Sequence, residues 1–348
     1  MVLRDDSKPY LCVTYNQGLK KLLFIRFSSI GDIVLTTPVV RCVSKQLPGA
    51  EVHYLTKTAF AGILKSNPYI HKVHLLDDDV NETLSRLKSE RFDFVVDLHH
   101  NIRSSRFRMG LGAPSAAFPK LNIEKWLLVN LKWNRMPDIH IVDRYFKTVA
   151  GLGLKNDGEG LDYFIPESDR VDLNNLPESY RRGYIAMVIG AQHATKRMPA
   201  VRLNEVASKL KLPIVLLGGK DDFQNGEVIL KGNESTVFNA CGKFNLNQSA
   251  SLVHDARVVI THDTGLMHIA AAFRKRIVSL WGNTVPAFGM TPYLPAASKG
   301  SHVFEVEGLG CRPCSKIGYD TCPKGHFKCM TEIDLDAVVR KAHDLFNE

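Results

Sequence analysis

The amino-acid sequence predicts two α/β domains, each built on a parallel β-sheet that is covered by helices on both faces. Apolar runs rich in branched and aromatic residues recur along the chain, and helical patterns separate them. A polar segment with Pro, Gly and Asn, residues 154–183, interrupts this alternation once and is expected to be a linker. A chain of 348 residues also has the length of about two domains.

The first half of the chain carries four strand-like runs. Continuous apolar runs of this kind are typical of strands that are buried on both faces of a parallel sheet. The runs are KLLFIRF (21–27), EVHYLT (51–56), KVHLL (72–76) and FDFVVDLH (92–99). Helical patterns are expected over residues 33–47, 58–66, 80–90, 123–134 and 138–153.

The alternation starts again after the linker. Five strands are expected here: YIAMVIGA (184–191), PIVLLGG (213–219), TVFNACG (236–242), ARVVITHD (256–263) and RIVSLWG (276–282). Two successive units of this kind are typical of two Rossmann-like, doubly wound domains that face each other across a central cleft. Ligands of such sheets bind outside the carboxyl ends of the strands, so the strand ends should carry the functional residues.

The polar linker sets the expected domain boundaries. We expect the first domain to span residues 1–165 and the second to span residues 180–330. The remaining residues, 331–348, contain the helical pattern DLDAVVRKAHDLFNE, and we expect this C-terminal helix to pack back on the first domain.

The composition is that of an ordinary globular protein, with 45% hydrophobic and 23% charged residues. The net charge of +9 favours an anionic partner, namely a nucleic acid, a phosphorylated small molecule or an acidic membrane surface; a basic protein without a special partner is the alternative. No apolar run reaches the roughly 18 residues of a membrane span, and the first ten residues lack the apolar region of a signal peptide. We therefore expect a cytoplasmic protein, in which seven cysteines, an odd number, do not suggest a disulfide framework.

One strand end of the second domain carries residues suited to an anion. The segment VVITHDTGLMHIAAA leaves an apolar strand, turns at Asp263, Thr264 and Gly265, and enters a helix. Gly265 permits close backbone approach, Thr264 offers a hydroxyl, and the helix start favours a pyrophosphate. Asp263 would repel phosphate, so we expect it to orient the loop by accepting backbone N–H bonds. The alternative for the Asp-Thr-Gly segment is an ordinary N-capping turn. The alternative for His268, which lies one turn into the helix, is a structural histidine.

Two further strand-end loops of the second domain suit a nucleotide. In GAQHATKRMP, Lys196 is placed to neutralise a diphosphate with Thr195 beside it, although a solvated basic loop fits the spacing equally well. In WGNTVPAFGM, Gly282 and Thr284 lie in a loop that can wrap a base or a ribose, or that is an ordinary turn. Three such loops in one domain indicate a nucleoside-diphosphate site.

The first domain has no comparable glycine-rich loop, so we expect it to hold the other substrate. Its first strand runs into RFSSIGDIVLTTP, in which the only glycine, Gly31, is followed by Asp32. A carboxylate that faces the cleft can take a proton from an attacking hydroxyl, which makes Asp32 a candidate general base. The alternative is a helix N-cap, with Ser28 and Ser29 as turn residues.

Several of these motifs together resemble a known family. SSIGDIVLTTP, HDTGLMHIAAA, the loop ATKRMP and the segment CRPCSKIGYDTCPKGHFKCM are similar to those of the ADP-heptose:lipopolysaccharide heptosyltransferases, glycosyltransferase family 9, and the resemblance runs from Lys20 to the final helix. It implies a GT-B fold whose second domain holds the sugar nucleotide. It also implies inverting transfer of a heptose or related sugar from an ADP-sugar to a lipopolysaccharide inner-core or lipid-linked acceptor, without a cofactor or a metal.

The resemblance further implies roles for individual residues. Asp32 matches the family's base, and Asp263, Thr264, Gly265 and Lys196 match its phosphate contacts. The lysine, the threonine hydroxyl and the N–H groups of the helix start would then stabilise the leaving diphosphate in place of a metal ion. Because the base and the leaving-group residues fall in different expected domains, we expect the cleft to close before reaction.

We assign donor binding to the second-domain loops as a set. The set is Thr195, Lys196, Asp263, Thr264, Gly265, His268, Gly282 and Thr284, with Asp32 and Lys196 as the catalytic residues and no metal ligand. The sequence departs from the family at Met198, since a tryptophan is usual before Pro199. Because of that departure, the sequence does not determine how this loop packs.

Basic residues between positions 101 and 150 indicate where an anionic acceptor binds. This region contains nine Lys and Arg residues and only three acidic residues, an excess of positive charge that suits a phosphorylated lipid-linked saccharide. We expect no nucleic acid as a partner. We assign acceptor contacts to Ser28, Ser29, Gly31, Arg103 and Arg106. In the same region IEKWLLVNLKWN (123–134) carries two tryptophans beside lysines, which suits peripheral contact with the inner membrane surface. A helix packed on its own domain is the alternative.

A cysteine-rich segment lies near the C-terminus. It holds Cys311, Cys314, Cys322, His326 and Cys329 within nineteen residues, a spacing that suggests a structural zinc ion in a cytosolic protein. The resemblance implies that these cysteines belong to the family pattern and that no metal is required for catalysis. We therefore favour a reduced, packed loop near the donor site.

Two other functions stay open on the residues alone. A sugar-nucleotide epimerase of GT-B fold would convert the nucleotide sugar without an acceptor. A non-catalytic binding protein would hold a nucleotide sugar without turnover, and Asp32 would be dispensable. A nicotinamide oxidoreductase is disfavoured, because G-x-G-x-x-G follows neither domain's first strand.

Overall fold

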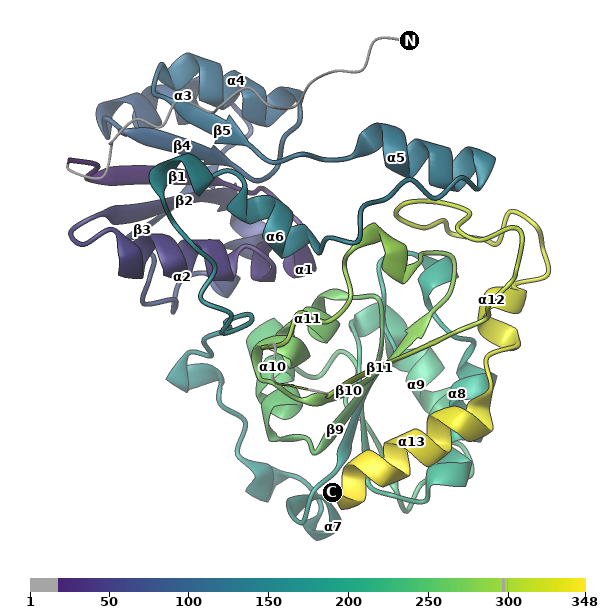
Figure 1. Ribbon diagram of the computed structural model, residues 1–348. Helices are drawn as coiled ribbons and strands as arrows, with labels where there is room; N and C mark the ends of the chain where they lie inside the picture. Colours follow the sequence, from purple (N-terminus) through teal and green to yellow (C-terminus); the bar gives the residue numbers. More distant parts are fainter. Residues whose placement is uncertain (1–17, 296–297, 299) are drawn as a thin grey trace. The chain divides into compact units, whose positions relative to one another are not determined.

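The computed structural model describes residues 18–295, 298 and 300–348, so the expectation about the first ten residues lies outside the described part (Figure 1). The chain forms two compact units, each with its own parallel sheet. Of the described residues, the first unit holds 18–28, Thr36–Lys120 and Val142–Asp157; the second holds Ser29–Leu35, Leu121–Ile141 and Gly158–Glu348. Among the described residues, no helix has the length and apolar character needed to cross a membrane.

The first unit contains a five-stranded parallel sheet with the strand order β3-β2-β1-β4-β5. The strands are β1 (Lys21–Ile25), β2 (Glu51–Lys57), β3 (Lys72–Leu76), β4 (Phe94–Asp97) and β5 (Ser115–Ala117). The helical elements are α2 (Thr37–Gln46), the 3₁₀ helix η1 (Thr58–Ile63), α3 (Val80–Ser89), α4 (Ile102–Leu111), α6 (Ile141–Phe146) and η3 (Ala150–Leu152). All four expected strands of this half are confirmed.

The second unit contains a six-stranded parallel sheet with the strand order β11-β10-β9-β6-β7-β8. The strands are β6 (Ile185–Val188), β7 (Ile214–Leu217), β8 (Val237–Asn239), β9 (Val258–His262), β10 (Arg276–Trp281) and β11 (Ser301–Glu305). The helices are α1 (Ile30–Val34), α5 (Asn122–Trp126), α7 (Glu178–Arg181), α8 (Ala200–Leu210), α9 (Phe223–Leu230), α10 (Leu246–Asp255), α11 (Gly265–Ala272), α12 (Lys328–Thr331) and α13 (Leu335–Asn347). All five expected strands of this half are confirmed.

Both sheets are doubly wound, as the sequence predicts. In each sheet the chain builds outward from its first strand in one direction and then reverses, so that β1 lies beside β4 and β6 lies beside β9. The central strands are mostly apolar and almost completely buried, because helices cover both faces of each sheet. The carboxyl ends of β6 and β9 therefore form a topological switch point, the usual ligand site of such sheets.

The C-terminal helix α13 packs on the second unit, so the expectation that it returns to the first domain is wrong. It contacts α8 and strands β9 and β10, and Figure 1 shows it in yellow beside α8. One side of the helix is apolar and enters the core of this unit through Leu335, Val338, Ala342 and Leu345. That spacing is the stripe of an amphipathic helix, and the nearest uncovered apolar surface lies on the unit from which the helix emerges.

The sequence does not predict two of the edge strands, β5 in the first sheet and β11 in the second. β5 has only three residues, Ser-Ala-Ala, and β11 is only partly buried. Neither strand forms a long apolar run, because an edge strand pairs on one side only and its side chains are less buried. The expected linker contains the short elements η4 (Glu167–Asp169), η5 (Leu173–Asn175) and α7.

Candidate functional site

Three strand-end loops of the second unit meet at one carboxylate oxygen. Lys196 ends the 3₁₀ helix η6 (Ala194–Lys196) in the loop after β6, and Asp263 directly follows β9. The Lys196 ammonium lies 2.6 Å from Oδ2 of Asp263. The same oxygen accepts a hydrogen bond of 2.9 Å from the hydroxyl of Thr284, which follows β10. At the switch point of this sheet, one oxygen of Asp263 therefore forms an ion pair with Lys196 and accepts a hydrogen bond from Thr284.

Asp263 orients side chains and not backbone amides, so that part of the sequence prediction is wrong. In the described part of the chain, its carboxylate accepts from Lys196 and Thr284. The side chains of Lys196 and Asp263 are 17% and 12% exposed, so water screens the pair only partly. The lysine is thus held in place, with its charge already partnered, before any anion arrives.

The N-terminus of α11 lies next to this ion pair. Thr264 occupies the N-cap position in an extended conformation, but its side chain makes no capping hydrogen bond; its hydroxyl lies 3.5 Å from that of Thr261. The first N–H groups of an α-helix have no partner inside the helix and carry the positive end of its dipole. This helix start is therefore suited to an anion, and a side-chain N-cap does not explain the Asp-Thr-Gly turn.

Thr195 and Gly282 hold the loops together. The Thr195 hydroxyl is buried, donates to the Tyr319 carbonyl at 3.1 Å and accepts from its N–H at 2.8 Å. A Cβ built on Gly282 would lie 2.8 Å from the Thr195 carbonyl oxygen, so only glycine fits there. The structure gives both residues a structural contact within the site.

Arg312 was missed by the sequence reasoning, and Asn283 lies in the expected nucleotide loop WGNTVPAFGM but was given no role of its own. The Arg312 guanidinium donates to the carbonyl oxygens of Gly282 and Thr284 and forms an ion pair of 2.7 Å with Glu305. Asn283 is buried, and neither polar atom of its side chain has a hydrogen-bond partner in the structure. A buried unpaired amide is costly and points to a missing partner. The arginine lies in the cysteine-rich segment, where the sequence drew attention to the thiols.

Helix α1, which carries Asp32, packs on α11. The segment Ser29–Leu35 groups with the second unit and not with the strands that flank it in the sequence. A Cβ built on Gly31 would lie 2.6 Å from Cδ2 of His268, and one built on Gly265 would lie 2.6 Å from Cγ2 of Ile30. The two helices approach through their glycines. The expected separation of the base and the leaving-group residues into different domains therefore does not hold for this segment.

Asp32 is held by the first turn of α1. Its Oδ2 accepts from the Ser29 N–H at 3.2 Å and from the Ser29 hydroxyl at 2.8 Å, as in a capping box. The carboxylate is only partly buried. The capping alternative is therefore correct as geometry, and it leaves a carboxylate with a defined orientation at the helix start.

His268 fills the space between the two helices. Its ring is buried against Gly31, and burial lowers the pKa of this histidine to about 4 although Asp263 and Asp32 act in the opposite direction. Nδ1 of the ring has no hydrogen-bond partner in the structure. The ring is thus neutral at pH 7 and packs beside the charged groups of the site.

Comparisons with known proteins bear on the family and the fold of this chain. The family model of glycosyltransferase family 9 (heptosyltransferase) matches residues 81–320. The chain belongs to glycosyltransferase family 9. It is 24% identical to lipooligosaccharide heptosyltransferase 2 of Haemophilus ducreyi, over 93% of this chain and 99% of that protein. It is 28% identical to lipopolysaccharide heptosyltransferase 2 of Salmonella typhimurium, over 94% and 99%.

Solved structures of family 9 proteins confirm the fold of this glycosyltransferase. The ADP-heptose lipopolysaccharide heptosyltransferase II of E. coli superposes with a TM-score of 0.72 at 21% identity, over 94% of this chain and 98% of that one. A family 9 glycosyl transferase of Veillonella parvula gives 0.74 at 23% identity, over 94% and 97%. The GT-B fold is therefore confirmed. The comparisons do not favour the epimerase or the non-catalytic binding protein.

The loop with Met198 is well packed in this family 9 enzyme despite the departure from tryptophan. The Met198 side chain is buried in the core of the second unit, and its N–H donates to Nε2 of His262 at 3.0 Å. Next to it, Arg197 forms an ion pair of 3.1 Å with Asp222. These contacts hold the loop directly after Lys196.

The expected acceptor residues of the glycosyltransferase divide between the units. Ser29 and Gly31 lie beside Asp32 in the second unit, whereas Ser28 lies in the first. Arg103 and Arg106 lie on α4 of the first unit; Arg103 is exposed, and Arg106 donates to the Asn81 side chain at 2.9 Å. Of the nine basic residues expected on this surface, Arg144 is buried and does not contribute.

The segment with two tryptophans is exposed along one side and anchored on the other. It consists of α5 and a π-helix, Leu127–Leu131. Ile123, Trp126 and Trp133 are 73%, 56% and 62% exposed. Leu128 is buried, and the Lys132 ammonium donates to the carbonyl oxygens of Cys311 and Pro313. The alternative of a helix packed on its own, first domain is wrong for this segment, because the segment groups with the second unit and only its buried side is packed.

The cysteine-rich segment supports the donor loops through Arg312 and Tyr319. Its cysteines are free, and Sγ of Cys311 lies 3.8 Å from Nε2 of His326. Among the described residues, some groups of three or more His, Cys, Asp or Glu have all their ligand atoms within 4.8 Å of one another. None of these groups includes these cysteines. The segment thus packs against the donor loops, as the sequence predicts.

Proposed function

We propose that this glycosyltransferase moves a heptose, or a related sugar, from an ADP-sugar to a lipopolysaccharide inner-core or lipid-linked acceptor, with inversion at the anomeric carbon. The names of its relatives support the donor and the acceptor class. The observation that carries the proposal is the contact of Lys196 and Thr284 with Asp263 at the switch point, beside the start of α11.

The diphosphate of the donor binds at that helix start. Negative charge develops on the departing ADP, and the Lys196 ammonium, the Thr264 hydroxyl and the first N–H groups of α11 stabilise it. Asp263 orients Lys196 and Thr284 before the donor binds. These fixed donors take the place of a divalent ion, and the buried amide of Asn283 supplies a further polar contact at the same site.

Asp32 acts as the general base. Its carboxylate removes the proton of the acceptor hydroxyl as the oxygen attacks the anomeric carbon from the face opposite the diphosphate. The two bonds from Ser29 hold the carboxylate in one orientation. Because α1 packs on α11, the base and the leaving-group residues share one rigid support, which suits an in-line displacement.

Exposed basic and apolar side chains of α4 suit the acceptor, and those of the α5 segment suit the membrane. On α4, Arg103 and Arg106 suit the phosphates of an inner-core saccharide, and the exposed Ile102 and Met109 suit its lipid portion. In the second unit, the exposed side chains of the α5 segment suit peripheral contact with an anionic bilayer. We place the reaction at the cytoplasmic face of the inner membrane.

The proposal is tested by incubating the protein with a panel of nucleotide sugars and a deacylated inner-core acceptor, and measuring the products by mass spectrometry. A product heavier than the acceptor by one heptose, formed only with the ADP-sugar, is expected, with and without EDTA. Conversion of the donor without acceptor would contradict transfer. Full loss of activity in EDTA, restored by Mg²⁺ alone, would contradict the metal-free mechanism.

A further inference from the structure

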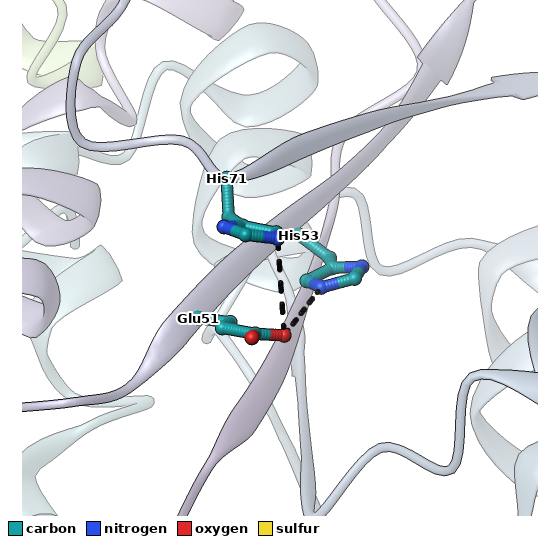
Figure 2. A group of neighbouring side chains, drawn as sticks. All are labelled: Glu51, His53 and His71. Carbon is teal, nitrogen blue, oxygen red and sulfur yellow. Dashed lines mark hydrogen bonds and ion pairs between the residues drawn. The ribbon is translucent and has the colours of Figure 1, made fainter.

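A cluster of histidines and carboxylates lies at the amino ends of the strands of the first sheet. Glu51 begins β2, His53 follows two residues later on the same face, and His71 directly precedes β3. Their ligand atoms all lie within 4.8 Å of one another. Figure 2 shows the three side chains pointing toward one another. Substrates of such sheets bind at the carboxyl ends of the strands, so this cluster lies at the edge of its own sheet where substrates do not bind.

The three side chains converge on one point. Oε2 of Glu51 lies 3.5 Å from Nε2 of His53 and 4.0 Å from Nε2 of His71 (Figure 2). Two ligands at about 2.0–2.1 Å from a tetrahedral Zn²⁺ lie about 3.3–3.5 Å apart. The observed spacing is therefore close to that of a coordination sphere. The backbone N–H of His71 donates to the Val52 carbonyl at 2.8 Å, which fixes the position of this residue beside β2.

His74 is the outer hydrogen-bond partner of His53. Nδ1 of His53 lies 2.8 Å from Nε2 of His74, and both rings are buried with their edges or faces against Phe92. A bond between two imidazole nitrogens needs one N–H and one lone pair. If His53 Nδ1 donates, its Nε2 carries a lone pair that points to Glu51. Ligating histidines usually have such an outer partner for the second nitrogen.

We propose that Glu51, His53 and His71 bind a divalent transition-metal ion of the Zn²⁺ type. Two imidazole nitrogens and one carboxylate are ligands that suit Zn²⁺, Co²⁺ or Ni²⁺ and do not suit Mg²⁺ or Ca²⁺. The His71 side chain is 58% exposed, which gives the ion access from solvent and leaves positions for water. The ion joins the edge strand β3 to β2 and has a structural role outside the transfer reaction.

Lys21 competes with the ion for the carboxylate. Its ammonium lies 3.6 Å from Oε2 of Glu51 and 3.5 Å from Oε2 of Glu90, so it has a second partner when the metal takes Glu51. Glu90 also forms part of a second group with His53 and His74. That group is less suited to a metal, because Lys72 lies 2.5 Å from Glu90 and the His53–His74 bond occupies the facing nitrogens.

Titration calorimetry of the full-length protein with Zn²⁺ under reducing conditions tests the proposal. His71→Ala is the test variant because this side chain is exposed, and His254→Ala is the control because His254 is also exposed and lies 2.8 Å from a single carboxylate, Asp255. We expect His71→Ala to lose one equivalent of bound Zn²⁺, or to bind it at least roughly tenfold more weakly. His254→Ala should match the wild type. Zinc bound by the cysteines is common to all three proteins and cancels.

Two further variants test the competition. Glu51→Gln should weaken the same binding event, and Lys21→Met should strengthen it severalfold because the competing ammonium is removed. Equal stoichiometry and affinity in the wild type and His71→Ala would overturn the proposal, and so would unchanged affinity in both Glu51→Gln and Lys21→Met. Circular dichroism confirms that each variant is folded, and none of these measurements depends on transferase activity.

Discussion

The ammonium nitrogen of Lys196 lies 2.6 Å from Oδ2 of Asp263, and this contact joins the loops that follow the two central strands of the second sheet. The sequence separates the two residues by 67 positions. The pair has no net charge, so it is stable without a ligand. The neighbouring helix start supplies the additional attraction for a diphosphate. Asp263 thus positions Lys196 and Thr284 at this edge of the sheet.

Replacement of Lys196 by alanine should weaken the binding of ADP. The variant loses a charge-assisted hydrogen bond worth about 1.5–3 kcal/mol, which corresponds to roughly 10- to 100-fold in affinity. Titration calorimetry with ADP measures the change. Lys209→Ala is the control, because Lys209 lies in the same unit and pairs with Asp336 on the surface. Unchanged ADP affinity in Lys196→Ala would exclude Lys196 from the donor site.

Replacement of Asp32 by asparagine should lower turnover by at least roughly 100-fold and leave donor binding intact. The asparagine oxygen can still accept the two bonds from Ser29, so the cap of α1 and the stability are retained. Single-turnover kinetics and ADP binding measured on the same variant separate the two effects. Turnover within about threefold of the wild type would show that the carboxylate only caps the helix.

Alanine at Gly31 or Gly265 should destabilise the second unit by about 1–3 kcal/mol, because the added Cβ overlaps His268 or Ile30 at the contact between α1 and α11. Turnover should fall as Asp32 moves. Urea unfolding followed by tryptophan fluorescence reports this unit, since Trp126, Trp133 and Trp281 all lie in it.

Gly310→Ala is the control for the two glycine variants, since a Cβ there has no neighbour within 4 Å. Equal stability of all three variants would contradict tight packing between α1 and α11.

Acidification should destabilise the second unit between about pH 6.5 and 4. Burial lowers the pKa of both His262 and His268 from 6.5 to about 4 in the folded chain. Each histidine binds a proton more readily when unfolded, so its contribution is fully present above pH 6.5 and is lost as the pH falls towards 4. At pH 5 the loss is roughly 2 kcal/mol for each histidine. The charged neighbours are Asp263, Asp32 and Lys196 at His268, and Arg197 and Asp263 at His262.

Urea unfolding at several pH values measures this dependence. His268→Gln should reduce the slope of stability against pH over this range, because one titrating group is removed. His254→Gln, at an exposed position, should leave the slope unchanged. An equal slope in His268→Gln and the wild type would mean that the buried ring does not control acid stability.

The double variant Trp126→Ala, Trp133→Ala should bind anionic vesicles at least roughly fivefold more weakly than the wild type, because two exposed aromatic side chains no longer enter the interface. Vesicle sedimentation measures the change. Val201→Ala removes another exposed apolar side chain of the same unit and should have no effect. Equal binding of the double variant and the wild type would place the membrane contact elsewhere.

The sequence by itself determined the two doubly wound units and the strand-end loops that carry Lys196, Asp263 and Thr284. Strands buried on both faces need continuous apolar runs, and such runs are visible without a structure. Parallel strands also place their carboxyl ends at one edge, so Lys196, Asp263 and Thr284 were expected to lie close together. The role of Asp263 was not predictable, because its partners come from loops 67 and 21 positions away.

Only the tertiary structure decided which surfaces pack together. The amphipathic stripe of α13 predicts a buried face but not its partner, which is α8 and not the first unit. The glycines at 31 and 265 read as turn residues, but their lack of a side chain lets α1 contact α11 and groups Asp32 with Lys196. In the sequence, Glu51 and His53 lie in one expected strand and His71 lies just before another, and only the parallel register of β2 and β3 brings the three together. Local patterns determine elements because they depend on neighbouring residues, whereas these contacts depend on side chains distant in the chain.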